Sequence, residues 1–222
     1  MINKKNIENL IKNAGDAKIV AAVKQRSIQE INALLECGID TIGENRVQDL
    51  LAKYDETRAF KWHFIGNLQT NKVKYIVDKV SLIQSVDRES LALEIQKQCQ
   101  KRGIVMPVLI EVNLDEDSKG GVKINELYAL LKFVSALPNL KLEGLMFIPP
   151  IDAPMQTYQQ IHQIYTKHKF EFNLSILSCG MSDDYQIAIK HGGANMIRPG
   201  SILFNSKRGE KNEGDTNEIV IV

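Results

Sequence analysis

The feature that most constrains the fold is a regular alternation of short, β-rich apolar runs with longer stretches of helical periodicity. Eight apolar runs are present, at residues 18–23, 41–43, 62–65, 82–85, 108–112, 142–147, 174–177 and 195–197. The helical stretches between them cover residues 27–37, 46–54, 71–78, 88–101, 124–137, 155–167 and 183–191. Strands that strictly alternate with helices favour parallel β/α units. Eight units in 222 residues therefore predict an α/β protein with a single (β/α)₈ TIM-barrel-like domain.

An open, doubly wound sheet is the alternative architecture that the same alternation allows. The first apolar run is not followed by Gly-x-Gly-x-x-Gly, so the usual reason for preferring a dinucleotide-binding sheet is missing. No Pro- or Ser-rich linker interrupts the body of the chain, which predicts one barrel domain over residues 1–205. Residues 206–222 are charged and rich in Gly and Asn over most of their length, and we expect a mobile tail there.

Composition narrows the classes of partner. The formal net charge is only +1, so no overall field recommends nucleic acid or an anionic membrane, and a small molecule is the expected partner. The three cysteines are far apart and form no Cys-x-x-Cys pair, which predicts neither a disulfide framework nor a zinc site. No apolar run approaches the length of a membrane span. We therefore expect a cytoplasmic protein, and its single domain favours a monomer.

Lys24 is the strongest candidate for a reactive group, because it directly follows the apolar run that forms the first predicted strand. An amine at the mouth of an apolar strand is partly desolvated, which favours the free amine that attacks aldehydes. Taken alone, a solvated strand-end lysine is the better interpretation, since lysine is mostly exposed in folded proteins. The residues at the other strand ends decide between these two interpretations.

Two later strand ends have the composition of a phosphate site. Residues 178–182 (Ser-Cys-Gly-Met-Ser) end one strand and open a helix, where backbone N–H groups and the helix dipole favour an anion. Gly200 and Ser201 follow the last strand, and TIM barrels often bind phosphate with the loops after strands seven and eight. The alternatives are a plain N-cap at Ser182 and a simple turn at Gly200. Taken together, the two segments favour a phosphate pocket.

Two further polar residues lie in or after predicted strands. Arg198 ends the last strand, where an arginine either pairs with a carboxylate or donates to a ligand. His63 lies within a strand, where a hydrogen-bonded core histidine is more common than a catalytic base. His63 has no second His, Cys or carboxylate at ligand spacing, so we predict no metal site.

Several motifs at these strand ends together resemble one family, the pyridoxal-phosphate homeostasis proteins (YggS/PROSC family), a single-barrel group related to the N-terminal domain of alanine racemase. The resemblance covers about residues 19–204. Its motifs are Ala22-Val23-Lys24, Gly43-Glu44-Asn45-Arg46-Val47-Gln48, residues 62–72 (WHFIGNLQTNK), Gly144-Leu145-Met146, Gly180-Met181-Ser182-Asp183-Asp184 and Arg198-Pro199-Gly200-Ser201. Each motif alone is weak, but the combination is specific.

The resemblance implies a site for pyridoxal 5'-phosphate (PLP). Lys24 would hold the cofactor as an aldimine, and Arg198 would lie near the pyridine nitrogen. The matching phosphate positions are Ser182, Gly200 and Ser201, with Gly180 and Met181 completing the loop, while Asn45 and His63 lie in motifs that face the pocket. An arginine at the ring nitrogen only donates, which weakens the ring as an electron sink.

The function that this resemblance implies is a non-catalytic PLP carrier in intracellular vitamin B6 and amino-acid homeostasis, with no catalytic residue and with PLP-dependent apoenzymes as partners. One alternative is a PLP-dependent amino-acid racemase. Racemases of this fold use a second domain and a partner subunit to supply a tyrosine, so this chain would need His63 as its second base. The other alternative is a barrel that binds a phosphorylated metabolite without forming an aldimine.

Overall fold

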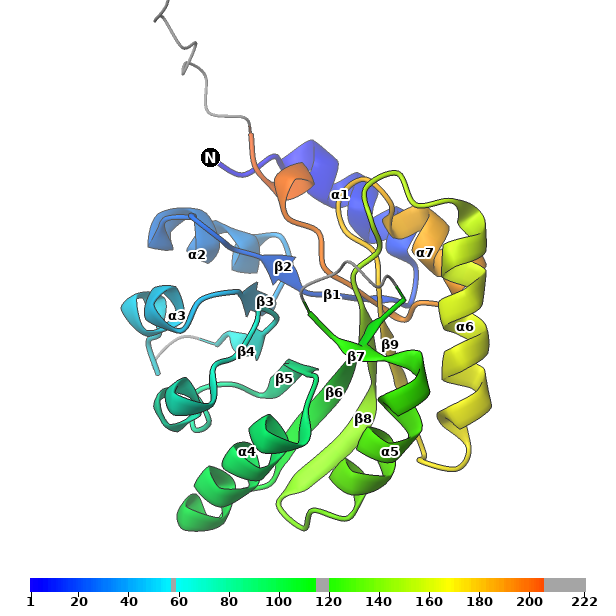
Figure 1. Cartoon of the computed structure of the whole chain (residues 1–222). Helices are drawn as coiled ribbons and strands as arrows, with labels where there is room; N and C mark the ends of the chain where they lie inside the picture. Colours follow the sequence, from blue (N-terminus) through cyan, green and yellow to red (C-terminus); the bar gives the residue numbers. More distant parts are fainter. Residues whose placement is uncertain (57–58, 115–119, 206–222) are drawn as a thin grey trace, which may run out of the picture.

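The computed structural model describes residues 1–56, 59–114 and 120–205. The predicted tail, residues 206–222, lies outside the described residues. Figure 1 shows strands that surround a common centre, with helices arranged outside them.

The strands form one parallel sheet that closes into a barrel. The strand order is β1-β10-β9-β8-β6-β5-β4-β3-β2. The short strand β7 stands outside this order and pairs only with β6 among the described strands. The strands are β1 (Lys18–Ile19), β2 (Ala21–Ala22), β3 (Thr41–Glu44), β4 (Lys61–Phe64), β5 (Leu82–Val86), β6 (Met106–Asn113), β7 (Val122–Lys123), β8 (Leu140–Phe147), β9 (Ile176–Ser178) and β10 (Met196–Ile197). The predicted barrel class is confirmed, and the open sheet is excluded.

The barrel closes through the first predicted strand, which is split into β1 and β2 around Val20. β1 pairs with β10, whereas β2 pairs with β3, so the two halves stand at opposite ends of the strand order. Backbone hydrogen bonds continue across the split, because Val20 N–H donates to the Ile197 carbonyl at 2.9 Å. The single strand predicted over residues 18–23 therefore serves two neighbours, and its two halves form the seam of the barrel.

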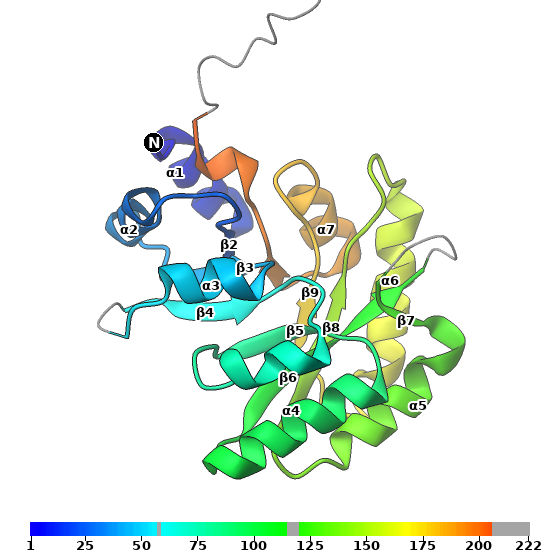
Figure 2. The same cartoon turned by 60° about the vertical axis from the view of Figure 1, so that its left-hand side comes forward.

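Helices cover the outside of the barrel, as Figures 1 and 2 show. They are α1 (Lys4–Ala14), α2 (Ile28–Glu36), α3 (Val47–Lys53), α4 (Glu89–Arg102), α5 (Ile124–Ser135), α6 (Met155–Lys169) and α7 (Tyr185–Gly192), with 3₁₀ helices η1 (Thr70–Tyr75) and η2 (Ser201–Leu203). The helix predicted over residues 71–78 is thus a short 3₁₀ segment. Within the described parts of the chain, no helix has both the length and the apolar character that a membrane crossing requires.

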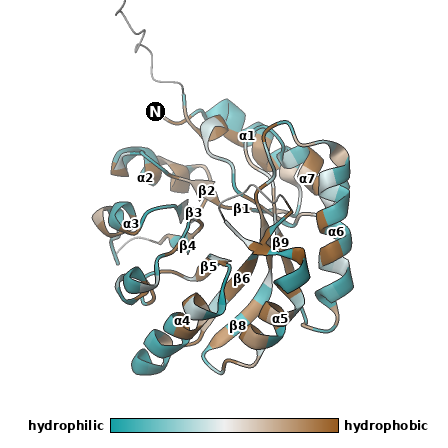
Figure 3. Ribbon diagram, in the orientation of Figure 1, coloured by the Kyte–Doolittle hydropathy of each residue, from teal (hydrophilic) through white to brown (hydrophobic). Residues whose placement is uncertain are grey.

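Two apolar cores hold the barrel. The larger lies between the strands and the helices, and Figure 3 shows hydrophobic strands beneath helices whose surfaces are largely hydrophilic. The smaller fills part of the barrel interior with Val20, which lies between β1 and β2, and with one side chain each from β5, β6, β8 and β10: Leu82, Leu109, Met146 and Met196. Because side chains alternate along a strand, the residue two positions further on also faces the interior, nearer the carboxyl ends of the strands. Three of the residues so placed, Gln84, Glu111 and Arg198, are polar.

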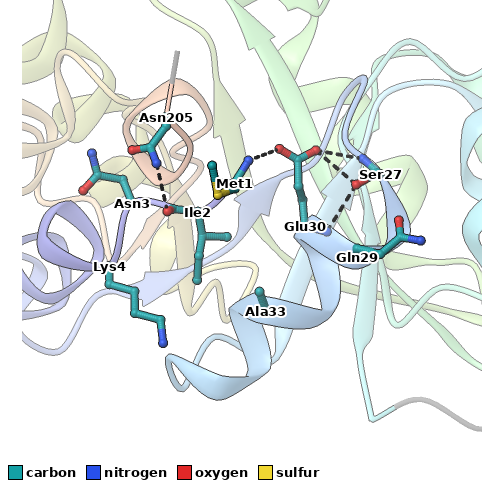
Figure 4. A pocket seen from close by; sticks show the side chains of 9 residues that line it. All are labelled: Met1, Ile2, Asn3, Lys4, Ser27, Gln29, Glu30, Ala33 and Asn205. Atoms are coloured by element: carbon teal, nitrogen blue, oxygen red, sulfur yellow. Dashed lines mark hydrogen bonds and ion pairs between the residues drawn. The ribbon is translucent and has the colours of Figure 1, made fainter. Parts of the chain in front are cut away.

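The amino terminus is tied to the start of α2. Ser27 and Glu30 form a reciprocal capping box, and the Met1 ammonium contacts the Glu30 carboxylate at 2.8 Å. This hydrogen bond from Met1 is the main reason that the pKa of Glu30 falls to about 2. Figure 4 shows these contacts in a surface cavity of about 720 Å³, whose lining includes none of the predicted cofactor-binding residues. The cavity is therefore separate from the candidate site.

Candidate functional site

The residues predicted to form the site lie at the carboxyl ends of neighbouring strands. Lys24 follows β2, Asn45 follows β3, and residues 180–182 follow β9. Arg198 and Gly200 follow β10, which lies between β9 and β1 in the sheet. Parallel strands present all these ends at one rim, which is the face where TIM barrels carry their sites.

Ser182 joins the two predicted phosphate loops directly. Its hydroxyl oxygen accepts hydrogen bonds from the N–H groups of Gly200 at 2.9 Å and Ile202 at 3.2 Å. Helix α7 begins at Tyr185 and is preceded by Asp184 as its N-cap residue, so Ser182 is not a helix N-cap. Two backbone donors from one loop thus converge on an oxygen atom of the other.

The loop before Ser182 needs a glycine at position 180. Gly180 has a φ of +98°, and a Cβ atom there would lie 2.8 Å from the Ala188 Cβ. Its carbonyl accepts the Arg198 N–H at 2.8 Å, while the neighbouring Met181 N–H donates to Asp184 Oδ1 at 2.5 Å. These contacts tie the loop after β9 both to α7 and to the end of β10.

Lys24 is exposed, rather than partly desolvated as its sequence context suggested. An ion pair between Lys53 and Glu44 lies next to the backbone of Val23, which precedes Lys24. The Lys53 ammonium also donates to the Val23 carbonyl at 3.0 Å, and the other Glu44 oxygen accepts the Asn45 N–H at 2.9 Å. This pair therefore connects the backbones that lead to Lys24 and Asn45.

The Glu44–Lys53 pair was not predicted from the sequence, although a signal was present. Side chains alternate along a strand, so Glu44 faces the same side as Ile42, toward the larger core between the strands and the helices. Glu44 is completely buried. A carboxylate buried under a helix requires a cation. Lys53, at the end of the helix that follows β3, supplies it.

Asn45 lies exposed on the rim, and its position depends on Gly66. A Cβ atom at Gly66 would lie only 2.2 Å from the Asn45 carbonyl oxygen. The loops after β3 and β4 also line a polar cavity of about 580 Å³ that includes Asn45, Arg46, Asn67 and Lys72. The motif glycine at position 66 is therefore explained by a close backbone approach.

Arg198 and His63 both lie inside the barrel. Arg198 is 4% exposed and donates to the Ser178 hydroxyl at 2.6 Å and to the Phe147 carbonyl at 2.8 Å, and neither acceptor is a carboxylate. His63 is 2% exposed, and its Nδ1 lies 2.9 Å from the Gln84 amide nitrogen. Burial is the main reason that the pKa of His63 falls to about 3. The imidazole is therefore neutral at physiological pH.

Glu111 is a titratable residue of the upper barrel that was not predicted from the sequence. It lies two residues beyond the interior Leu109 and lines a cavity of about 510 Å³ with Phe147 and Pro149. Burial is the main cause that raises the pKa of Glu111 to about 7, and the Asp87 charge raises it further, while Arg198 lowers it. The sequence feature that could have identified Glu111 is its position two residues after Leu109, because side chains two apart on a strand face the same side.

We expect Glu111→Gln to stabilise the protein at alkaline pH. The Glu111 carboxyl titrates near 4.5 when unfolded and near 7 when folded, so the wild type loses stability as the pH rises through this window. Glutamine has no such loss, and the variant should gain about 1–3 kcal/mol at pH 8 relative to pH 4. Urea unfolding at both pH values measures this difference, and identical pH profiles for the two proteins would contradict it.

Comparisons with known proteins agree on one family. The family model "Alanine racemase, N-terminal domain" matches residues 3–207. The pyridoxal phosphate homeostasis protein of Aquifex aeolicus (strain VF5) is 42% identical over 201 residues, covering 86% of this chain and 88% of the relative. The protein of the same name from Helicobacter pylori (strain 26695) is 40% identical over 196 residues, covering 84% of this chain and 86% of the relative.

Solved structures agree with this assignment. PipY of Synechococcus elongatus PCC7942, solved with PLP bound, superposes with a TM-score of 0.83 at 28% identity, covering 91% of this chain and 99% of PipY. The alanine racemase of Clostridium difficile 630 shares the fold, with a TM-score of 0.76 at 16% identity, covering 94% of this chain and 57% of the racemase. The chain therefore belongs to the alanine racemase N-terminal-domain family and, within it, to the pyridoxal phosphate homeostasis proteins.

Proposed function

We propose that this protein is a non-catalytic PLP-binding protein that holds the cofactor through Lys24 and acts in intracellular vitamin B6 and amino-acid homeostasis. The observation that carries the proposal is the convergence of the Gly200 and Ile202 N–H groups on Ser182. These residues follow the carboxyl ends of their strands, at the same rim of the barrel as Lys24. The relatives named for PLP homeostasis and the PLP-bound PipY structure support the same function.

The described residues fit the three chemical parts of PLP. The Ser182 oxygen accepts from the Gly200 and Ile202 N–H groups, so its own hydroxyl proton is suited to a phosphate oxygen, with Gly180, Met181 and Ser201 completing the two loops. The exposed Lys24 amine is accessible to an aldehyde, and PLP supplies the aldehyde that condenses with a primary amine to a C=N bond with loss of one water. We assign Asn45 to the rim of this pocket.

Arg198 fits the ring nitrogen. Its guanidinium can only donate hydrogen bonds, and its two protein partners use one N–H each on Nη1 and Nη2. The remaining N–H groups are suited to an acceptor such as the pyridine nitrogen. A permanent cation there opposes protonation of the ring, which suits a carrier better than a carbanion catalyst.

No observation favours the racemase alternative. His63, the base that this alternative requires, is buried in the barrel and already bonded to Gln84. With a pKa of about 3, the imidazole is a weak base that stays unprotonated at neutral pH, so it is poorly suited to accept a substrate proton. We infer that His63 belongs to the site through its hydrogen bond to Gln84 inside the barrel. We also infer that the protein acts as a cytoplasmic monomer that supplies PLP to PLP-dependent apoenzymes.

The proposal is tested by the absorption spectrum of the purified protein mixed with PLP. The wild type should show the band of lysine-bound PLP, borohydride should remove that band, and mass spectrometry of the reduced protein should locate PLP on Lys24. Lys24→Ala should show no such band. The matched control is Lys97→Ala, which removes an exposed lysine from the outer helix α4 and should leave the band intact.

Two results would contradict the proposal in different ways. A wild type that binds PLP reversibly without a borohydride-sensitive band would favour a phosphate-binding barrel that uses no lysine linkage. Turnover of a single amino-acid enantiomer by the PLP-loaded protein, abolished in His63→Ala, would favour the racemase.

A further inference from the structure

Four buried polar side chains form one hydrogen-bonded chain across the interior of the barrel. Arg198 donates to the Ser178 hydroxyl at 2.6 Å, and that hydroxyl donates to Gln84 Oε1 at 2.6 Å. The Gln84 amide nitrogen lies 2.9 Å from His63 Nδ1. Each of the four residues is at most 4% exposed. The chain connects the ends of β10 and β9 with β5 and β4.

The donor at every step is determined by the cation at one end. Arginine can only donate, so the Ser178 oxygen accepts from Arg198 and its proton is directed to the Gln84 carbonyl oxygen. The Gln84 amide then faces His63 with its N–H group, so Nδ1 must carry the lone pair and Nε2 the proton. The pKa of about 3 for His63 agrees with this neutral form.

The buried guanidinium donates to two neutral acceptors, the Ser178 hydroxyl and the Phe147 carbonyl. The titratable groups whose charges act on it are Cys179, Glu111 and Asp184. Neutral acceptors fix the direction of the guanidinium without forming a hydrogen-bonded ion pair with it. The same amide nitrogen of Gln84 also lies 3.4 Å from the Met196 sulfur, which restricts the rotation of Gln84. The chain is thus suited to hold Arg198 in one orientation.

We propose that Ser178, Gln84 and His63 are positioning residues that hold the Arg198 guanidinium toward the pyridine nitrogen of PLP. This inference rests on the proposed function. None of the three residues needs to touch the cofactor. Their effect is to keep a charged donor at the ring nitrogen, and so to set the protonation behaviour and the affinity of bound PLP.

The test compares Ser178→Ala with Ser85→Ala. Both serines lie in the barrel wall and are at most 1% exposed, but the Ser85 hydroxyl has no hydrogen-bond partner among the described residues. Loss of the Ser178 hydroxyl should raise the PLP dissociation constant about tenfold. It should also shift the pH midpoint of the bound-PLP absorption band by about one unit, while Ser85→Ala changes neither.

Two more variants complete the design. Gln84→Met keeps the side-chain volume but removes the amide oxygen and the amide N–H groups, and it should reproduce the effect of Ser178→Ala. Ser178→Thr keeps the hydroxyl and should restore the wild-type midpoint. Circular dichroism and urea unfolding of each variant distinguish loss of positioning from loss of fold, because a purely structural role would lower stability without moving the pH midpoint.

The outcomes separate this inference from the proposed function. If the wild type and all variants bind PLP with the same affinity and pH midpoint, the positioning role is wrong and the proposed function stands. If the wild type takes up no PLP, the proposed function is wrong and the inference falls with it. A shifted midpoint in folded Ser178→Ala and Gln84→Met, but not in Ser85→Ala, supports the inference.

Discussion

Replacing Lys53 with methionine should lower the free energy of unfolding by about 3–5 kcal/mol, because it leaves the buried Glu44 carboxylate without its cation. Methionine has nearly the volume of the lysine stem, so the effect reports the charge more than the packing. The variant also loses the donor to the Val23 carbonyl, which precedes Lys24. Urea unfolding of the protein without cofactor measures the loss, and PLP binding should weaken in the same variant.

The double variant Glu44→Gln with Lys53→Met is the matched control for this experiment. Glutamine retains an oxygen that can accept the Asn45 N–H but carries no charge. The double variant should therefore be more stable than Lys53→Met alone, since replacing both members of a buried pair costs less than removing one. A Lys53→Met protein as stable as the wild type would show that the pair is solvated and carries no structural role.

Gly66→Ala is expected to damage both the fold and the cofactor pocket. The new Cβ atom would lie 2.2 Å from the Asn45 carbonyl oxygen and 2.6 Å from its Cα, so the backbone after β3 must move. We expect a loss of about 3 kcal/mol in the free energy of unfolding, at the upper end of the usual cost of overpacking. Because Asn45 moves away from the rim position assigned to it, PLP affinity should fall about tenfold.

Gly43→Ala provides the comparison, because it adds a methyl group in the neighbouring motif. Its Cβ would lie 2.7 Å from the Cδ1 atom of Ile65, which is the end of a side chain that can rotate. The expected cost is about 1 kcal/mol, smaller than for Gly66→Ala. Equal losses in the two variants would indicate that the Asn45 backbone adapts as easily as the Ile65 side chain, and would contradict the role given to Gly66.

Much of the fold could be predicted from the sequence, because the barrel class follows from the spacing of apolar runs. The run at residues 82–85 is β5, and the neighbouring runs also pair in the predicted parallel sense. The helix expected over residues 71–78 is a 3₁₀ segment, since its Thr, Asn, Val and Tyr residues have low helix propensity and the connection is short. The split around Val20 depends on which strands become neighbours, which local periodicity does not encode.

The candidate site, like the fold, could be predicted only in part from the sequence. Lys24, Ser182 and Gly200 could be predicted because parallel strands place their ends at one rim, although their binding of PLP stays a prediction. Gln84 and the Glu44–Lys53 pair were missed, because an interior polar residue is recognised only when its partner is known. The alternation of side chains gives the direction of a residue but not the identity of its neighbour.

The seam of the barrel also bears on how the protein is made. The strand segment β1, which leads toward Lys24, is synthesised long before its partner β10, because most of the described chain lies between them. Contacts between segments so distant in the sequence slow folding. Until β1 and β10 pair, the incomplete sheet has open edges that can pair with other chains. The Ala22 N–H reaches the Pro199 carbonyl, at 2.8 Å, only once the seam has closed. A ligand that bridges Lys24 and Gly200 would bind only completed barrels, and would draw the folding equilibrium toward them.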